Sequence, residues 1–252
     1  MAEPSSAIAH VISPAKFKSR YLGSPSAIAS AAAVELHGLL QRHVSGLPFG
    51  IALSGGRIAK SFYEEVVQSC RKAPVDFENV HFFWADERCV PPLDPESNYL
   101  TAQTFLFQPL EIPVSNIHRI FGEADPAYAC AQAEAELCRI MPLDENGQPR
   151  LDLVILGMGE DGHVASLFPG EPEEMITDGK VYRSVIAVKP PPQRITLGYA
   201  PIFAARECWV LASGEGKKAA YERLEQGDAS LPIARIVSGR SETLIFQDIK
   251  AR

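Results

Sequence analysis

Short apolar runs recur along the chain and are separated by longer amphipathic stretches. The run at residues 151–156 is almost entirely apolar, which is typical of a strand buried on both faces, as in a parallel sheet. We expect this run to form a strand. Further strands are expected at residues 49–53, 79–85, 181–188, 195–197, 207–212 and 243–246.

Helical periodicity fills the stretches between these runs. Apolar residues are spaced for helices at residues 25–44 and 58–70. Ser24 and Asp125 are each followed by proline, the arrangement of an N-cap and a first helical position. The other expected helices cover residues 97–107, 126–141 and 217–225.

Strands that alternate with helices predict an α/β fold. We expect a single, doubly wound, mostly parallel sheet with helices on both faces, which is a Rossmann-like architecture. No internal repeat, low-complexity segment or linker interrupts the pattern. Residues 1–252 are therefore expected to form one domain.

Composition narrows the classes of protein to consider. Hydrophobic residues make up 46% and charged residues 22% of the 252 residues, as in an ordinary globular protein. The net charge of -7 argues against nucleic-acid or anionic-membrane partners, so an anionic ligand would need local basic residues. The five cysteines are odd in number and lack C-x-x-C spacing, which favours neither a disulfide framework nor a structural zinc site.

The N-terminal stretch has no basic segment followed by an apolar core, and no run approaches the ~20 apolar residues of a membrane-spanning helix. We therefore expect a cytoplasmic protein with reduced thiols. Its oligomeric state is left open between a monomer and a small homo-oligomer.

The loop after the strand at residues 151–156 carries the most informative chemistry. Gly159 and Gly162 allow tight turns, and they flank Asp161 and His163. In open α/β sheets, ligands bind beyond the carboxyl ends of the strands. An imidazole oriented by a carboxylate is the usual arrangement for a general base, so we favour this role over that of a hydrogen-bonded polar histidine.

The strand expected at residues 49–53 is followed by three small residues and a cation. Free N–H groups at the start of the next helix would attract an anion, and glycines remove the side chains that would block it. A plain tight turn is the alternative, but Arg57 and the nearby Lys60 favour phosphate. The candidate residues are Ser54, Gly55, Gly56 and Arg57.

Charged residues also follow other strands. Asp86 and Arg88 follow the strand at residues 79–85, where they would either pair with each other or line the rim of a cleft. Arg194 and Lys217 lie near further strand ends or loop starts. Isolated cations are usually solvated, but at these positions an anionic substrate would meet them.

The spacing Gly157-x-Gly159-x-x-Gly162 also matches the dinucleotide-binding pattern. The sequence that follows these glycines does not match a dinucleotide-binding unit. Pro169-Gly170 comes too soon for a crossover helix, and the next expected strand, at residues 181–188, does not end in the acidic residue that would hold a ribose. We therefore do not expect a nicotinamide cofactor.

These motifs together resemble the 6-phosphogluconolactonase family. The resemblance covers residues from about 20 to the end, with the order and the spacing of the motifs kept. It is carried by LSGG at residues 53–56, WADERCVP at 84–91, Ser97-Asn98, LGMGEDGHVASLFPG at 156–170, PPPQRITL at 190–197 and G-x-x-K at 214–217.

The resemblance implies hydrolysis of 6-phospho-D-glucono-1,5-lactone to 6-phosphogluconate, the second step of the oxidative pentose phosphate pathway, without metal or cofactor. It implies that His163 activates water, Asp161 orients His163, Arg88 stabilises the oxyanion, and Asp86 or Asn98 contacts sugar hydroxyls. The only partner implied is a small sugar phosphate. The phosphate group would be held by Ser54, Gly55, Gly56, Arg57, Arg194 and Lys217.

One motif departs from the family pattern. The family commonly has Ser or Thr, Thr and Pro after Ser-Gly-Gly, whereas this chain has Arg57, Ile58 and Ala59. Two hydroxyl donors are therefore missing, and Arg57 would supply charge in their place.

Two alternative functions are considered. The related glucosamine-6-phosphate deaminases have an Asn-Glu pair where this chain has Leu167-Phe168, so the carboxylate for sugar ring opening is absent. A noncatalytic sugar-phosphate-binding domain is the other alternative. The chain shows no helix-turn-helix segment or basic patch before the domain that would favour such a regulator.

Overall fold

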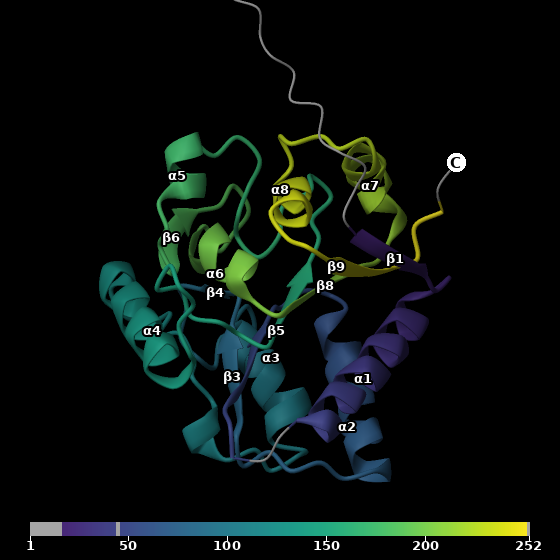
Figure 1. Ribbon diagram of the computed structural model, residues 1–252, viewed down its shortest axis with the longest axis vertical. Coiled ribbons are helices and arrows are strands. Elements are labelled where there is room, and N and C mark those ends of the chain that lie inside the picture. The colour runs from purple at the N-terminus through teal and green to yellow at the C-terminus, as the bar shows by residue number, and fades with distance from the viewer. Residues whose placement is uncertain (1–16, 44–45, 251–252) are drawn as a thin grey trace, which may run out of the picture.

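A computed structural model describes residues 17–43 and 46–250 (Figure 1). The strands are β1 (Phe17–Tyr21), β2 (Phe49–Leu53), β3 (Val80–Trp84), β4 (Asp86–Arg88), β5 (Leu153–Gly157), β6 (Tyr182–Ile186), β7 (Gln193–Leu197), β8 (Glu207–Ala212) and β9 (Thr243–Gln247). The α-helices are α1 (Pro25–Arg42), α2 (Ala59–Lys72), α3 (Asn98–Ala102), α4 (Pro126–Ile140), α5 (Glu173–Thr177), α6 (Tyr199–Ala204), α7 (Lys218–Glu225) and α8 (Pro232–Ser238). Shorter helical turns are the π-helical η1 (Gln103–Phe107) and the 3-10 turns η2 (Val114–Asn116) and η3 (Glu215–Lys217).

Six strands form a parallel sheet in the order β1-β9-β8-β5-β2-β3. Helices α1 and α2 lie on one side of this sheet, and α6, α7 and α8 lie on the other (Figure 1). The predicted Rossmann-like α/β fold is confirmed. The sheet is hydrophobic throughout its middle, since every residue of β2 is buried.

A second, three-stranded antiparallel sheet adds to the predicted fold, in the order β4-β7-β6. The strands expected at residues 181–188 and 195–197 exist, but they belong to this small sheet. The chain passes from one sheet to the other at Ala85, whose N–H donates to Leu53 O and whose carbonyl accepts from Leu197 N, each at 2.7 Å. The polar residues after β3 are therefore a short strand rather than a loop.

The helix caps form as the sequence predicts. Ser24 Oγ accepts a hydrogen bond from Ala27 N at 3.2 Å at the start of α1, and Asp125 Oδ1 accepts from Ala127 N at 3.0 Å at the start of α4. Strand β1 and helices α5, α6 and α8 were not predicted. Four of the five residues of β1 are exposed, so this edge strand has no hydrophobic pattern to reveal it.

The strand order places a crevice between β2 and β5. From β2 the chain crosses through α2 to β3 at one edge, whereas from β5 it proceeds in the opposite direction to β8 and β9. The loops that follow β2 and β5 therefore diverge at the carboxyl ends of these strands. Such a switch point is where ligands bind in open α/β sheets.

In the described part of the chain, no helix combines the length and the apolar character needed to cross a membrane. All five cysteines are free. Our expectation about an export signal falls mainly on residues 1–16, which lie outside the described residues.

A half-buried pair of histidines, His81 and His118, packs between β3 and α4. His118 Nε2 lies 3.0 Å from Nδ1 of His81, and His118 Nδ1 lies 2.9 Å from Oε1 of Glu136. The His118 ring also stacks on Phe83. Burial lowers the pKa of His118 from 6.5 to about 4, and the charge of Glu136 offsets only part of this effect.

We predict that the free energy of unfolding decreases as the pH falls from about 6.5 to about 4. The unfolded chain protonates this histidine near its ordinary pKa, whereas the folded protein resists protonation until a lower pH. The unfolded state therefore holds more protons in this window, and stability rises with pH. Urea unfolding at several pH values should show this slope, and the slope should be smaller in His118→Phe. Equal slopes in the two proteins would contradict the assignment.

Candidate active site

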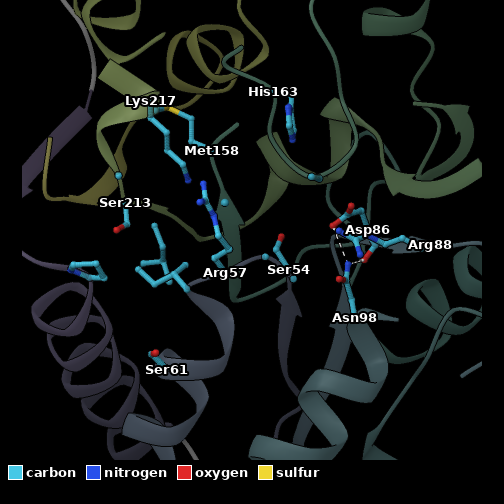
Figure 2. Close-up of a pocket in the computed structure, with 18 of the residues that line it drawn as sticks. Ser54, Arg57, Ser61, Asp86, Arg88, Asn98, Met158, His163, Ser213 and Lys217 are labelled. Carbon is cyan, nitrogen blue, oxygen red and sulfur yellow. Dashed lines mark hydrogen bonds between the residues drawn. The ribbon is translucent and has the colours of Figure 1, made fainter. Parts of the chain in front are cut away.

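A cavity of about 350 Å³ opens at the carboxyl ends of β2, β5 and β8 (Figure 2). It lies at the switch point of the sheet. All but one of the residues predicted from the sequence line it. They are Ser54, Gly55, Gly56, Arg57, Asp86, Arg88, Asn98, His163, Arg194 and Lys217.

The remaining predicted residue, Asp161, lies directly beside His163. Its Oδ1 is 2.6 Å from Nδ1 of His163 and also accepts a hydrogen bond from His163 N at 3.2 Å. The other ring nitrogen, Nε2, has no hydrogen-bond partner among the described residues. Burial alone would raise the pKa of Asp161, but the charge and the hydrogen bonds of His163 hold it below its ordinary value.

Close packing fixes this pair within the loop. Gly159 N donates to His163 O at 2.8 Å, and Gly162 adopts a φ of 83°. A Cβ atom at position 159 would lie 2.1 Å from Nδ1 of His163 and 2.6 Å from Oδ1 of Asp161. The ring of Phe168 covers another side of the imidazole, with ring centroids 5.0 Å apart. Gly159 is therefore required for the position of His163.

The loop between β2 and α2 forms another wall of the cavity. Ser54 is 9% exposed, and its hydroxyl has no hydrogen-bond partner in the described part of the chain. Gly56 has a φ of 99°, and a Cβ atom on Gly55 would lie 1.8 Å from Oδ1 of Asn98. A buried hydroxyl without a partner beside a helix N-terminus is a donor available to a ligand.

Two cations lie together beside this loop. Figure 2 shows the ends of Arg57 and Lys217 directed toward each other, from the loops after β2 and β8. Burial lowers the pKa of Lys217, and the charge of Arg57 lowers it further. An anion bound between the two side chains would relieve their repulsion.

The opposite wall is a buried polar network around Asp86. Asp86 Oδ2 accepts a hydrogen bond from Ser166 Oγ at 2.7 Å. Asn98 Nδ2 donates to the carbonyl oxygen of Asp86 at 2.8 Å. Arg88 does not pair with Asp86: its Nη1 contacts the carbonyl oxygen and the carboxylate of Glu96 at 2.6 and 3.4 Å. The alternative of a simple Asp86–Arg88 pair is therefore wrong.

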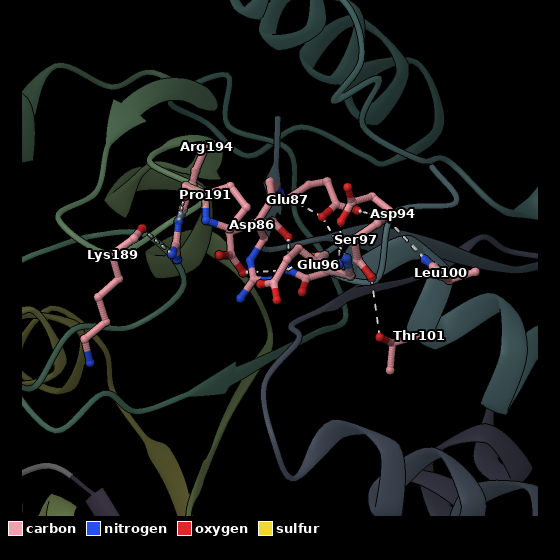
Figure 3. Close-up of polar contacts among 12 residues, drawn as sticks. Asp86, Glu87, Asp94, Glu96, Ser97, Leu100, Thr101, Lys189, Pro191 and Arg194 are labelled. Carbon is pink, nitrogen blue, oxygen red and sulfur yellow. Dashed lines mark hydrogen bonds and ion pairs between the residues drawn. The ribbon is translucent and has the colours of Figure 1, made fainter. Parts of the chain in front are cut away.

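Arg194 lies next to Arg88, because the two residues face each other in the β4–β7 ladder. Its guanidinium donates to the carbonyl oxygens of Pro191 and Lys189, at 3.1 and 3.2 Å (Figure 3). Burial lowers the pKa of Arg194, and the charge of Arg88 adds to this effect. Nε of Arg88 is buried and has no partner among the described residues. Arg88 and Arg194 thus give the cavity a second cationic side, in addition to the one formed by Arg57 and Lys217.

Sequence reasoning missed Glu87, which holds this wall together (Figure 3). Its buried carboxylate accepts hydrogen bonds from Ser97 Oγ at 3.0 Å and from the backbone N–H groups of Arg88, Asn98 and Tyr99 at 2.7 to 2.8 Å. Burial nevertheless raises its pKa. The available signal was strand alternation, because Glu87 points away from the face that carries its two neighbours.

A second cavity, of about 530 Å³, lies beside α4. It differs from the first cavity in how its ionisable groups are paired. Its ionisable side chains are paired with other protein groups: Arg139 and His118 with Glu136, and Arg119 with Glu123. Within residues 17–43 and 46–250, no cluster of three or more His, Cys, Asp or Glu side chains would hold a metal ion.

Residues 23–245 match the family described as glucosamine-6-phosphate isomerases/6-phosphogluconolactonase. The chain belongs to this family. Among its relatives, the 6-phosphogluconolactonase of Haemophilus influenzae is 36% identical over 206 residues, which are 80% of this chain and 85% of that protein. The 6-phosphogluconolactonase of Aggregatibacter actinomycetemcomitans is 34% identical over the same shares of the two chains.

Solved structures of the family agree with this fold. The 6-phosphogluconolactonase from Trypanosoma brucei superposes with a TM-score of 0.81 at 28% identity, over 92% of this chain and 97% of that one. A monomeric glucosamine-6-phosphate deaminase superposes with a TM-score of 0.75 at 18% identity, which shows the shared fold alone.

Proposed function

We propose that this protein hydrolyses 6-phospho-D-glucono-1,5-lactone to 6-phospho-D-gluconate, the second step of the oxidative pentose phosphate pathway. The observation that carries the proposal is the content of one cavity. An imidazole whose Nδ1 is held by Asp161 shares the cavity with a cationic pair, Arg57 and Lys217. A general base and a phosphate site are the two elements that a phosphorylated lactone requires. The names of the aligned bacterial relatives support the same activity.

We assign the phosphate group to the wall formed by the loop after β2. The Ser54 hydroxyl, the N–H groups of Gly55 and Gly56, and the N-terminus of α2 would donate hydrogen bonds, and Arg57 and Lys217 would supply charge. The family resemblance implies that Arg194 holds the phosphate group. Because Arg194 lies beside Arg88 in the structure, we assign it to the opposite wall instead.

In the reaction, Nε2 of His163 takes a proton from water while the water oxygen attacks the lactone carbonyl carbon. The tetrahedral oxyanion would face Arg88, with Arg194 adding positive charge. The bond from this carbon to the ring oxygen then breaks, and His163 returns the proton to that oxygen. Asp161 keeps the ring orientation and stabilises the imidazolium, and Asp86 or Asn98 would contact sugar hydroxyls.

The site also bears on the deaminase alternative. The two positions that hold Asn and Glu in glucosamine-6-phosphate deaminases carry Leu167, which is fully buried, and Phe168, which packs on His163. Neither side chain can exchange a proton with a sugar ring. We therefore favour lactone hydrolysis over deamination.

A coupled assay tests the proposal. The lactone is generated with glucose-6-phosphate dehydrogenase, and its loss is followed with and without this protein. We expect loss well above the spontaneous rate, and no ammonia release from glucosamine 6-phosphate. Ammonia release would favour the deaminase alternative. Tight binding of 6-phosphogluconate by a folded protein that accelerates neither reaction would favour a noncatalytic binding domain.

A further inference from the structure

One acidic side chain, Glu160, reaches toward the cationic pair of the cavity. It lies in the loop after β5, and its Oε1 is 3.7 Å from Nη2 of Arg57. The same oxygen lies 2.8 Å from the position that a Cβ atom on Gly216 would occupy, so it also borders the backbone just before Lys217. Glu160 therefore meets the loops after β2 and β8 at the side of the cavity where we place the phosphate.

The contact between Glu160 and Arg57 is weak. Their side chains are 57% and 86% exposed, and the 3.7 Å separation is too long for a hydrogen bond. Exposed ion pairs of this kind contribute little, and salt screens them. A phosphate carries more negative charge and three acceptor oxygens. It would therefore displace Glu160 from Arg57.

Two carboxylates lie near these cations, and they differ in how they are held. Burial lowers the pKa of Lys217, as does the charge of Arg57, whereas Asp248 and Glu160 act in the opposite direction. Asp248 is fixed by hydrogen bonds from Ser213 Oγ and Gly214 N, both at 2.8 Å. Glu160 forms no hydrogen bond with a described residue.

We propose that Glu160 limits the affinity of this site for phosphate. In the empty site it neutralises part of the charge of Arg57 and Lys217, and in the occupied site it repels the bound phosphate. This inference rests on the proposed function in one respect, since the same cations hold the phosphate of the substrate. Because the product keeps that phosphate, Glu160 would also favour product release.

The test is the affinity for inorganic phosphate, measured by titration calorimetry on the Glu160→Gln variant. We expect the Kd to fall by about 3- to 10-fold, because one negative charge is removed beside a multivalent anion. The gain should shrink at high salt and in an Arg57→Gln background. Glu64→Gln is the matched control, since Glu64 forms a similarly exposed pair with Lys60 at 3.9 Å, and Lys60, unlike Arg57, does not line the cavity.

Weaker phosphate binding by Glu160→Gln would overturn the inference and show that Glu160 positions Arg57 for the ligand. A Kd that changes no more than in Glu64→Gln would also overturn it. These results are independent of the proposed reaction. A protein that hydrolyses the lactone with an unchanged phosphate Kd refutes only the role of Glu160. A protein that binds phosphate more tightly as Glu160→Gln but does not act on the lactone refutes only the proposed reaction.

Discussion

Replacement of His163 by alanine is expected to lower kcat for lactone hydrolysis by about 10²- to 10⁴-fold, the usual contribution of a positioned general base. The binding of 6-phosphogluconate should change little, because the phosphate is assigned to the loop after β2 and to Lys217 rather than to the imidazole. Steady-state rates in the coupled assay and calorimetric titration of the product measure the two quantities separately.

Chemical rescue distinguishes a base from a structural residue. Imidazole added to His163→Ala should restore part of the activity, because the vacated space beside Asp161 opens onto the cavity. The unfolding temperature of the variant serves as the control for folding. A folded variant with the activity of the natural protein would show that another group activates the water, even if the reaction itself is correct.

Gly159→Ala is expected to reduce kcat by about 10²-fold although it leaves every catalytic side chain in the sequence. The added Cβ atom would overlap both Nδ1 of His163 and Oδ1 of Asp161, at 2.1 and 2.6 Å, so the pair must move apart or rotate. Displacement of a catalytic group by about 1 Å is enough for a loss of this size.

Gly38→Ala is a suitable control for that substitution. Gly38 lies in α1, where the nearest neighbour of an added Cβ atom is the flexible end of Arg42, at 3.2 Å. This variant should keep full activity. A Gly159→Ala protein that is equally active would mean that the loop tolerates a larger residue and that the close packing around His163 is not needed for catalysis.

The glycines after β5 show why a motif needs its structural context. Their spacing matches the dinucleotide-binding pattern, but two of the three have a local explanation here. Gly159 makes room for the ring of His163. Gly162 adopts a positive φ of 83°, and a Cβ atom there would lie 3.0 Å from Leu231. In this protein, Gly159 and Gly162 therefore allow the His163 loop to pack closely.

Strands and helices with strong apolar patterns were predictable from the sequence, because burial on both faces requires continuous apolar runs. The sequence did not predict which strands belong to which sheet. Strand β4 consists of Asp86, Glu87 and Arg88, whose polarity indicates a loop, and only the pairing with β7 makes it a strand. Edge strand β1 is mostly exposed and equally featureless in sequence.

The candidate site was predictable at the level of strand ends, since parallel strands bring their following loops to one edge of a sheet. The long-range contacts that position the site residues could not be predicted. Ser166 binds Asp86 across 80 positions of sequence, and no local pattern indicates such a pair. The placement of Arg194 beside Arg88 likewise depends on the register of the small sheet.

The hydrogen bonds of Glu87 have a consequence for the order in which the site assembles. Its partners lie at most 12 positions away along the chain, so they close short loops at small entropic cost. The contact between Ser166 and Asp86 closes a far longer one. The segment from Asp86 to Tyr99 is thus tied together by local contacts, whereas its pairing with β7 and its contact with the His163 loop form only after distant parts of the chain have met. Catalytic competence therefore depends on long-range folding, and a partly folded chain would hold this segment together without the base and without Arg194 beside it.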